Sequence, residues 1–159
     1  MKNQKYITII GLTLFCSYIL QDMLDFKFLY LENLQDQEMY KRWSGLGLAL
    51  FILFQWFLTF TRVIPKLRKH SIKLTNIHKW IGAFSPLLFY IHTTNYGYGY
   101  LALLSYIFLS NMLLGTINLD VIKSQKEWIF KSWMIVHVGL SMFITGLMFL
   151  HIGTVFYYK

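Results

Sequence analysis

Four histidines lie in strongly apolar stretches of this 159-residue chain and form two pairs with the same spacing. His78 and His92 are 14 residues apart, and so are His137 and His151. Fourteen residues of α-helix rise about 21 Å and complete about 3.9 turns, so both members of a pair face nearly the same way. Each helix would then carry one imidazole towards each of its ends. Neutral imidazole is a good ligand for iron and other transition metals.

The composition indicates the kind of element that holds these histidines. Hydrophobic residues make up 56% of the chain and charged residues 14%, whereas soluble domains carry about 25% charged residues. We therefore expect an all-α integral membrane bundle that forms a single domain over residues 1–159. The net charge of +8 could suggest nucleic acid, but its distribution along the chain fits a membrane protein. The single cysteine, Cys16, excludes an internal disulfide.

A membrane-spanning helix needs about 20 largely apolar residues, and the chain offers five candidates. Pro65 should end the second, Thr75 is the expected N-cap of the third, and Pro86 should kink that helix. No small-x-small cleavage site follows the first candidate, so we expect an uncleaved helix rather than a signal peptide. The candidates run from about Tyr6 to Leu20, Trp43 to Val63, Asn76 to Thr94, Tyr98 to Ile117 and Lys131 to Tyr157.

Basic residues predict the orientation of these spans. With the N-terminus inside, 11 of the 15 Lys and Arg residues fall on the inner side, which obeys the positive-inside rule. We expect a bacterial cytoplasmic membrane, a cytoplasmic N-terminus and an external C-terminus. The acidic segment 22–40 should then lie on the outer surface or contact a partner. The inner residues are Lys2, Lys5, Arg62, Lys66, Arg68, Lys69, Lys73, Lys79, Lys123, Lys126 and Lys131.

The third and fifth spans run in the same direction, because one span separates them. His78 therefore lies level with His137 near the inner side, and His92 lies level with His151 near the outer side. Each level presents two imidazoles to a planar macrocycle held between the two helices. Imidazole is a known axial ligand of haem iron. The pattern predicts two haem groups, with His78 and His137 on the inner iron and His92 and His151 on the outer iron.

Three alternative roles for the histidines fit the pattern less well. A proton relay usually includes Asp or Glu, and none lies deep in the five spans. A zinc site needs ligands that cluster around one ion, whereas these four lie at two depths. A single membrane histidine often only bonds a neighbouring helix, but two equally spaced pairs are hard to account for in that way. His70 lies outside the pattern, in a basic loop, and is expected to be solvated.

Residues near the histidines could complete such sites. Haem propionates need cations, for which Lys79, Lys131 and Arg62 are the main inner candidates. Gln55 and Asn111 are polar residues that either bond neighbouring helices, which is the simpler interpretation, or line a quinone pocket. Small residues would let a flat macrocycle approach the backbone or let helices pack closely. Further propionate candidates are Lys73, Lys41 and Arg42, and the small residues are Gly45, Gly47, Gly82, Gly115, Gly139 and Gly146.

The stretch HKWIGAF, which opens at His78, and the stretch LLFYIH, which ends at His92, resemble the third helix of ferric reductase-like transmembrane domains. That family carries a second histidine pair two helices later. The layout is also similar to the haem-binding half of the cytochrome b subunit of quinol-oxidising complexes. The resemblance covers residues 77–152, and it implies two b haems on the four histidines. The chain departs from the family in having five apparent spans instead of six.

These observations predict a dihaem b-type membrane cytochrome that carries electrons across the bilayer. The chain has no Gly-rich nucleotide fingerprint that opens a βαβ unit, so it should depend on other redox subunits or on a soluble donor and acceptor. Whether it is itself an enzyme stays open. The alternatives are the membrane subunit of a quinol oxidoreductase or metal reductase, with quinone as a candidate partner, and a haem-free accessory subunit. No nucleic-acid partner is expected.

Overall fold

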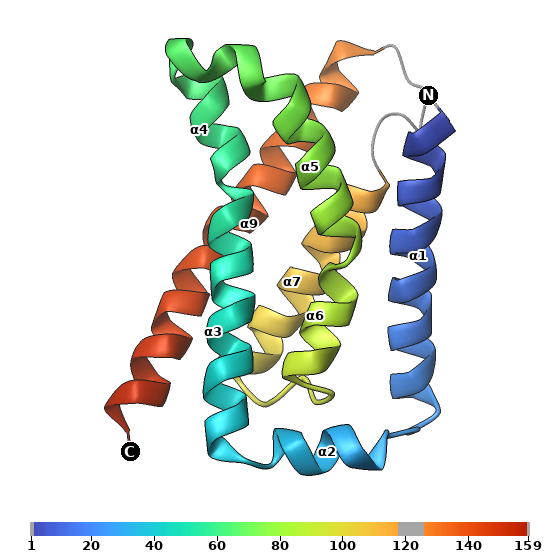
Figure 1. Ribbon diagram of the computed structural model, residues 1–159, viewed down its shortest axis with the longest axis vertical. Helices are drawn as coiled ribbons and strands as arrows, with labels where there is room; N and C mark the ends of the chain where they lie inside the picture. The colour runs from blue at the N-terminus through green and yellow to red at the C-terminus, as the bar shows by residue number, and fades with distance from the viewer. Residues whose placement is uncertain (1, 118–125, 159) are drawn as a thin grey trace.

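The computed structural model describes residues 2–117 and 126–158. Every regular element in these ranges is a helix, as the sequence predicts. The long helices run along the long axis of the molecule, whereas α2 and η1 lie across opposite ends of it (Figure 1). Lys123, Lys159 and the side chain of Lys2, which the sequence assigns to the two membrane sides, lie outside the described residues. The elements are α1 (Lys2–Met23), α2 (Leu29–Gln35), α3 (Glu38–Gln55), α4 (Phe57–Val63), η1 (Pro65–His70), α5 (Ser71–Ala83), α6 (Ser85–His92), α7 (Tyr100–Thr116) and α9 (Glu127–Tyr157).

Within the described residues, three helical segments are long and apolar enough to cross a membrane: Lys5–Met23, Glu38–Val63 and Glu127–Tyr157. The second of these comprises α3 and α4 together. The helix α7 is apolar but shorter, and the segment predicted to be the third span is divided into α5 and α6. The chain is thus an all-helical protein compatible with insertion into a membrane. Its long helices follow the five apolar segments of the sequence.

The division between α5 and α6 confirms the predicted effect of Pro86. Phe84 separates the two helices, two residues before the proline. Proline has no backbone N–H, so it cannot donate to the carbonyl of Gly82 four residues earlier. The hydroxyl of Ser85 donates to that carbonyl instead, at 2.6 Å. The freed acceptor is therefore satisfied locally, as an apolar environment requires.

The predicted start of this segment is wrong, because α5 begins at Ser71 rather than after Thr75. The Thr75 hydroxyl donates to the Ser71 carbonyl at 2.8 Å, inside the helix. A second interruption, at Trp56, was not evident from the sequence. There the Trp56 indole N–H donates to the Thr145 hydroxyl on α9 at 3.0 Å, so a contact between helices accompanies the break.

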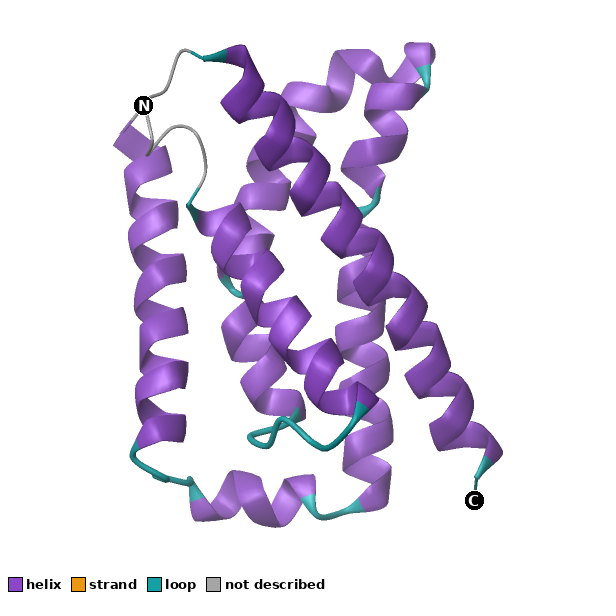
Figure 2. Ribbon diagram, turned by 180° about the vertical axis from the view of Figure 1, so that it is seen from behind, coloured by secondary structure: helices purple, strands orange, loops and turns teal. Residues whose placement is uncertain are grey.

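The hydrophobic core joins five of the helices. Its buried members come from α1, α3, α6, α7 and α9, and Phe89 stacks on Phe108 with ring centres 5.2 Å apart. Seen from behind, α9 runs obliquely across the molecule beside α7 (Figure 2). This core fixes the helices α6, α7 and α9 relative to one another. It consists of Tyr18, Leu48, Phe89, Phe108, Leu109 and Ile144.

The acidic segment 22–40 contains the short helix α2, which lies across one end of the bundle (Figure 1). Gln35 anchors it there although the rest of α2 is more exposed. Its amide nitrogen donates to the carbonyls of Tyr90 and Ile91, at 2.7 and 3.2 Å. Its amide oxygen accepts from the backbone N–H and hydroxyl of Thr94, at 3.2 and 3.0 Å. Gln35 therefore provides a donor for C-terminal carbonyls of α6, and the Tyr40 hydroxyl also donates to the Ile91 carbonyl, at 3.0 Å.

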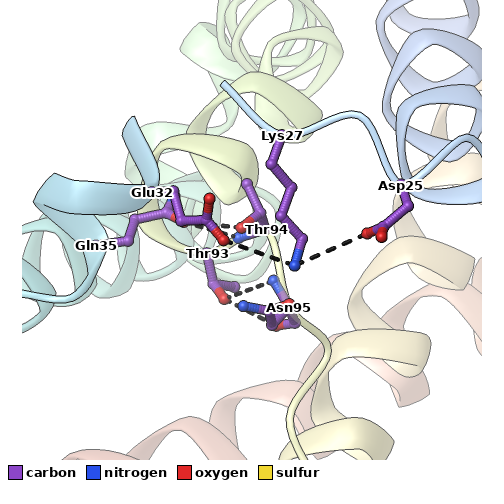
Figure 3. Close-up of polar contacts among 7 residues, drawn as sticks. All are labelled: Asp25, Lys27, Glu32, Gln35, Thr93, Thr94 and Asn95. Atoms are coloured by element: carbon purple, nitrogen blue, oxygen red, sulfur yellow. Dashed lines mark hydrogen bonds and ion pairs between the residues drawn. The ribbon is translucent and has the colours of Figure 1, made fainter. Parts of the chain in front are cut away.

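Ion pairs lie beside this anchor. Lys27 Nζ is 3.8 Å from a carboxylate oxygen of Asp25 and 3.6 Å from one of Glu32 (Figure 3). The Asp25 side chain is largely exposed and those of Lys27 and Glu32 are partly exposed, so each pair contributes about 0–1 kcal/mol to stability. The buried amide of Gln35, rather than these charges, holds α2 against α6.

Candidate metal centres

The structure brings His78 of α5 and His137 of α9 together. Their ring centres are 6.2 Å apart and their ring planes cross at 88°. The Nδ1 atoms of both rings are buried and make no hydrogen bond. These two residues were predicted to lie at one level, and this part of the prediction is met.

His92 of α6 and His151 of α9 form the second pair, near the end that α2 covers. Their ring centres are 6.5 Å apart and their planes cross at 62°. The four histidines therefore form the two pairs expected from their spacing. His70 belongs to neither pair and is exposed on η1.

Ser44 of α3 fixes the tautomer of His92. Its hydroxyl lies 3.2 Å from His92 Nδ1 and 2.7 Å from the carbonyl of Tyr40. A carbonyl can only accept, so the single hydroxyl proton goes to Tyr40, and the Ser44 oxygen accepts from Nδ1–H of His92. The other ring nitrogen, Nε2, then keeps its lone pair for a metal ion. Such an outer hydrogen bond is the usual partner of a metal-binding histidine.

Each pair borders its own cavity. The inner cavity, around His78 and His137, measures about 220 Å³. The outer cavity, around His92 and His151, measures about 540 Å³. Ile52 of α3 and Phe108 of α7 line both cavities, so little more than one layer of side chains separates them.

Two of the six glycines noted in the sequence lie against histidine rings. A Cβ atom on Gly45 would come within 2.9 Å of His92 Cε1, and one on Gly115 within 3.2 Å of His137 Cε1. Gly82 lines the inner cavity, where a Cβ would meet only the Gln55 amide at 3.9 Å. Side chains at Gly45 and Gly115 would thus displace the imidazoles. A Cβ at Gly47, Gly139 or Gly146 would meet nothing within 4 Å.

Some of the cationic residues predicted to contact propionates line the two cavities, and others do not. Arg62 of α4 and Lys79 of α5 line the inner cavity, and Lys41 and Arg42 of α3 line the outer one. Lys131 does not line the inner cavity. Its ammonium lies 3.3 Å from Glu127 on the same helix. Lys73 likewise lies away from the lining.

Gln55 and Asn111 both line the inner cavity. The amide nitrogen of Asn111 donates to the Ser141 hydroxyl on α9 at 2.9 Å, which is the bond between helices expected from the sequence. Ser141 donates in turn to the carbonyl of His137 at 2.8 Å. The amide oxygens of Gln55 and Asn111 are buried without a hydrogen-bond donor.

Two residues that touch the histidines were missed by sequence reasoning. Trp133 stacks on His137, with ring centres 5.5 Å apart and planes 5° from parallel. It precedes His137 by four residues, a spacing that places two side chains on one helix face, so the contact could have been inferred. Ser44 contacts His92 across 48 residues of chain, and nothing in the local sequence signals that pairing.

Among the residues that the structure describes, no three His, Cys, Asp or Glu side chains gather into a group that could hold a metal ion. Counted in these residue types, each histidine pair offers two ligands. Comparisons with protein-family models, with curated proteins and with solved structures gave no match. The interpretation of the two pairs rests on their own geometry.

Proposed function

We propose that this chain is a dihaem b-type membrane cytochrome that conducts electrons between the two faces of a bilayer. The observation that carries the proposal is the pair of facing imidazoles at each of two levels, His78 with His137 and His92 with His151. A bound haem b supplies an iron that accepts and releases one electron at a time. The residues of the chain supply its axial ligands, its position and its apolar surroundings.

The distances between the rings support metal binding between them. An imidazole nitrogen binds a first-row metal ion at about 2.0–2.1 Å, and the ring centre lies about 1.1 Å behind the nitrogen, so two rings on opposite sides of one ion have centres about 6.2–6.4 Å apart. The distances of 6.2 and 6.5 Å lie at or next to that range. With two side-chain ligands at each level, a metal ion needs further ligands from a bound group, and a macrocycle provides four in one plane.

The surroundings of each pair also fit a haem. Gly45 and Gly115 let the imidazoles of His92 and His137 lie against the helix backbone. Arg62 and Lys79 line the inner cavity, and Lys41 and Arg42 line the outer one, where they can neutralise propionates. We assign the inner haem to His78 and His137 and the outer haem to His92 and His151.

In this proposal the chain crosses the membrane five times, through α1, α3–α4, α5–α6, α7 and α9. The basic residues of η1 and α5 then face the cytoplasm of a bacterial cell, together with the N-terminus, in accordance with the positive-inside rule. The helix α2 and the C-terminus face outwards. Other redox subunits, or a soluble donor and acceptor, would exchange electrons with the two levels.

A haem assay on the purified protein tests the proposal. The pyridine haemochrome spectrum should report two b haems per chain. His92→Ala and His151→Ala should each remove the same haem, and His78→Ala and His137→Ala should each remove the other. His70→Ala is the matched control and should keep both, because His70 is exposed on η1. A protein without haem would exclude the proposal, and loss of different haems from two histidines of one level would exclude the pairing.

A quinol oxidoreductase subunit is the second candidate function. The observation in its favour is that two buried amide oxygens, on Gln55 and Asn111, line the inner cavity without a donor. A quinol carries two hydroxyl donors that could satisfy them. Haem reduction by a quinol, blocked by a quinone-site inhibitor and lost in Gln55→Leu, would favour this function over simple conduction.

A further inference from the structure

Trp133 is packed so that its indole plane is fixed. Its indole N–H donates to the carbonyl of Leu114 on α7 at 2.9 Å. Phe130 lies beside it on α9, with ring centres 6.4 Å apart and planes 30° from parallel. The hydrogen bond joins two helices and can be made only in a narrow range of indole orientations. Trp133 therefore presents one defined face to His137, the ring on which it stacks.

The ring of His137 is confined between this indole and the backbone of α7. Gly115 follows Leu114, and a Cβ there would lie 3.2 Å from His137 Cε1. Metal-binding histidines are usually oriented by an acceptor for their second N–H. His137 Nδ1 makes no such hydrogen bond, although the backbone of Asn111 faces the ring. The stacked indole therefore restrains the orientation of the ring in addition to the backbone of Asn111, whereas at the outer level Ser44 provides a hydrogen bond of good geometry to His92.

From these contacts, and on the premise of the proposed function, we infer that Trp133 is a positioning residue that holds the His137 ring nearly perpendicular to His78, so that the two haems differ in electronic structure. The inner planes cross at 88°, whereas the outer planes cross at 62°. The inner and outer sites thus share a ligand set and differ in the angle between the ligands.

The angle matters because an imidazole donates π-electron density only perpendicular to its ring plane. Two parallel rings raise the energy of the same one of the two iron dπ orbitals, so the two orbitals differ in energy. Two perpendicular rings raise both orbitals equally and leave them nearly degenerate. A low-spin ferric iron with degenerate dπ orbitals has a strongly anisotropic magnetic moment. An energy difference between the two orbitals also stabilises the ferric state. Perpendicular rings remove that difference, so they favour a higher reduction potential.

Electron paramagnetic resonance of the oxidised protein with both haems bound measures this angle. The spectrum should contain one highly anisotropic low-field signal and one more rhombic low-spin signal. The anisotropic signal should persist in His151→Ala, which keeps only the inner haem, and disappear in His137→Ala. A wild-type inner haem with an ordinary rhombic spectrum would overturn the inference.

Variants of Trp133 test the cause of the angle. Trp133→Leu removes the stacking face, so the inner signal should become rhombic and the inner midpoint potential should fall, with the haem still bound. Trp133→Phe keeps a flat face and should retain the anisotropic signal. The matched control is Trp128→Leu, because Trp128 lies on the same helix and is 65% exposed.

The outcomes separate the inference from the proposed function. An absence of low-spin haem in the wild-type protein would overturn the proposed function. Two bound haems with an inner signal unchanged in Trp133→Leu would overturn only the role of Trp133. Loss of the signal in Trp133→Phe as well would show that a flat face without the hydrogen bond to Leu114 does not hold the angle, and would overturn stacking alone as the cause. If Trp133→Leu fails to hold the inner haem, the comparison of Trp133→Phe with wild type and Trp128→Leu still decides whether an aromatic face suffices.

Discussion

Ser44 and His92 lie on different helices, and the serine hydroxyl is 3.2 Å from Nδ1 of the imidazole. The contact joins α3 to the end of α6, 48 residues apart in sequence. Because the hydroxyl proton is used by Tyr40 at 2.7 Å, Ser44 acts as an acceptor. A hydrogen bond from Nδ1–H makes the imidazole a stronger donor to a metal ion and so favours the oxidised iron.

Ser44→Ala should therefore raise the midpoint potential of the outer haem and weaken its retention, by about 10- to 100-fold in affinity. The inner haem should be unchanged. Redox titration followed at the haem absorption bands measures both effects. Ser110→Ala on α7 is the control, since Ser110 is exposed and bonded to no described residue. Equal potentials in Ser44→Ala and wild type would show that this bond does not tune the outer iron.

Gly45→Ala should impair the outer haem. Its new methyl group would lie 2.9 Å from His92 Cε1, which is too close unless the ring moves. Gly47→Ala is the matched control on the same helix, because its methyl would meet nothing within 4 Å. That control should be neutral, or stabilise α3 by about 0.5–1 kcal/mol through helix propensity. The haem content per chain distinguishes Gly45→Ala from Gly47→Ala. An intact outer haem in Gly45→Ala would contradict the packing argument.

Gln35→Ala should loosen α2 and the end of α6. The substitution removes the amide donor from the carbonyl of Tyr90, whereas the carbonyl of Ile91 keeps the Tyr40 hydroxyl at 3.0 Å. An unsatisfied group of this kind costs about 1–3 kcal/mol. Thermal unfolding in detergent, with and without haem, measures the loss of stability. Gln37→Ala is the control, since Gln37 is exposed, and it should change stability by less than about 0.5 kcal/mol. Equal melting temperatures for the two variants would contradict the anchor.

Arg62→Gln should lower the midpoint potential of the inner haem. Arg62 lines the inner cavity, and its positive charge favours the reduced state, which carries one more electron. Lys131→Gln provides a comparison, because Lys131 pairs with Glu127 at 3.3 Å and does not line the cavity. Its effect on the potential should be smaller. A larger shift for Lys131→Gln in redox titration would reverse the assignment of the propionate contacts.

Much of the fold follows from local patterns in the sequence. Apolar runs of spanning length predicted the long helices, and Pro86 predicted the break at Phe84, because a missing N–H acts within one helical turn. The level pairing of the histidines also follows, since 14 residues return a helix to nearly the same face. The helices and the break depend on residues near one another in sequence, whereas the pairing of the histidines also requires α5 and α6 to pack beside α9.

Other features depend on contacts between distant segments. The break at Trp56 accompanies a hydrogen bond to Thr145, and α2 is held by the bonds of Gln35 to α6. The start of α5 at Ser71 was also missed, because Thr75 resembles an N-cap but bonds backwards within the helix. The contact of Ser44 with His92 joins two separate helices. No pattern within a short window of sequence encodes such partners.

The helix α9 is continuous from Glu127 to Tyr157 and carries one ligand of each pair. Fourteen residues of unbroken helix place His137 and His151 about 21 Å apart along the axis of α9. Because α9 runs obliquely across the molecule (Figure 2), their separation across the membrane is at most about two thirds of the 30 Å hydrocarbon core. In the proposed function, an electron that passes between the two levels moves through a large part of the membrane's electric field. At about 2.3 kcal/mol per charge per 100 mV for the full thickness, that step exchanges up to roughly 1.5 kcal/mol with the field per 100 mV. Electron transfer through this small bundle would thus be electrogenic, and its rate would respond to the membrane voltage.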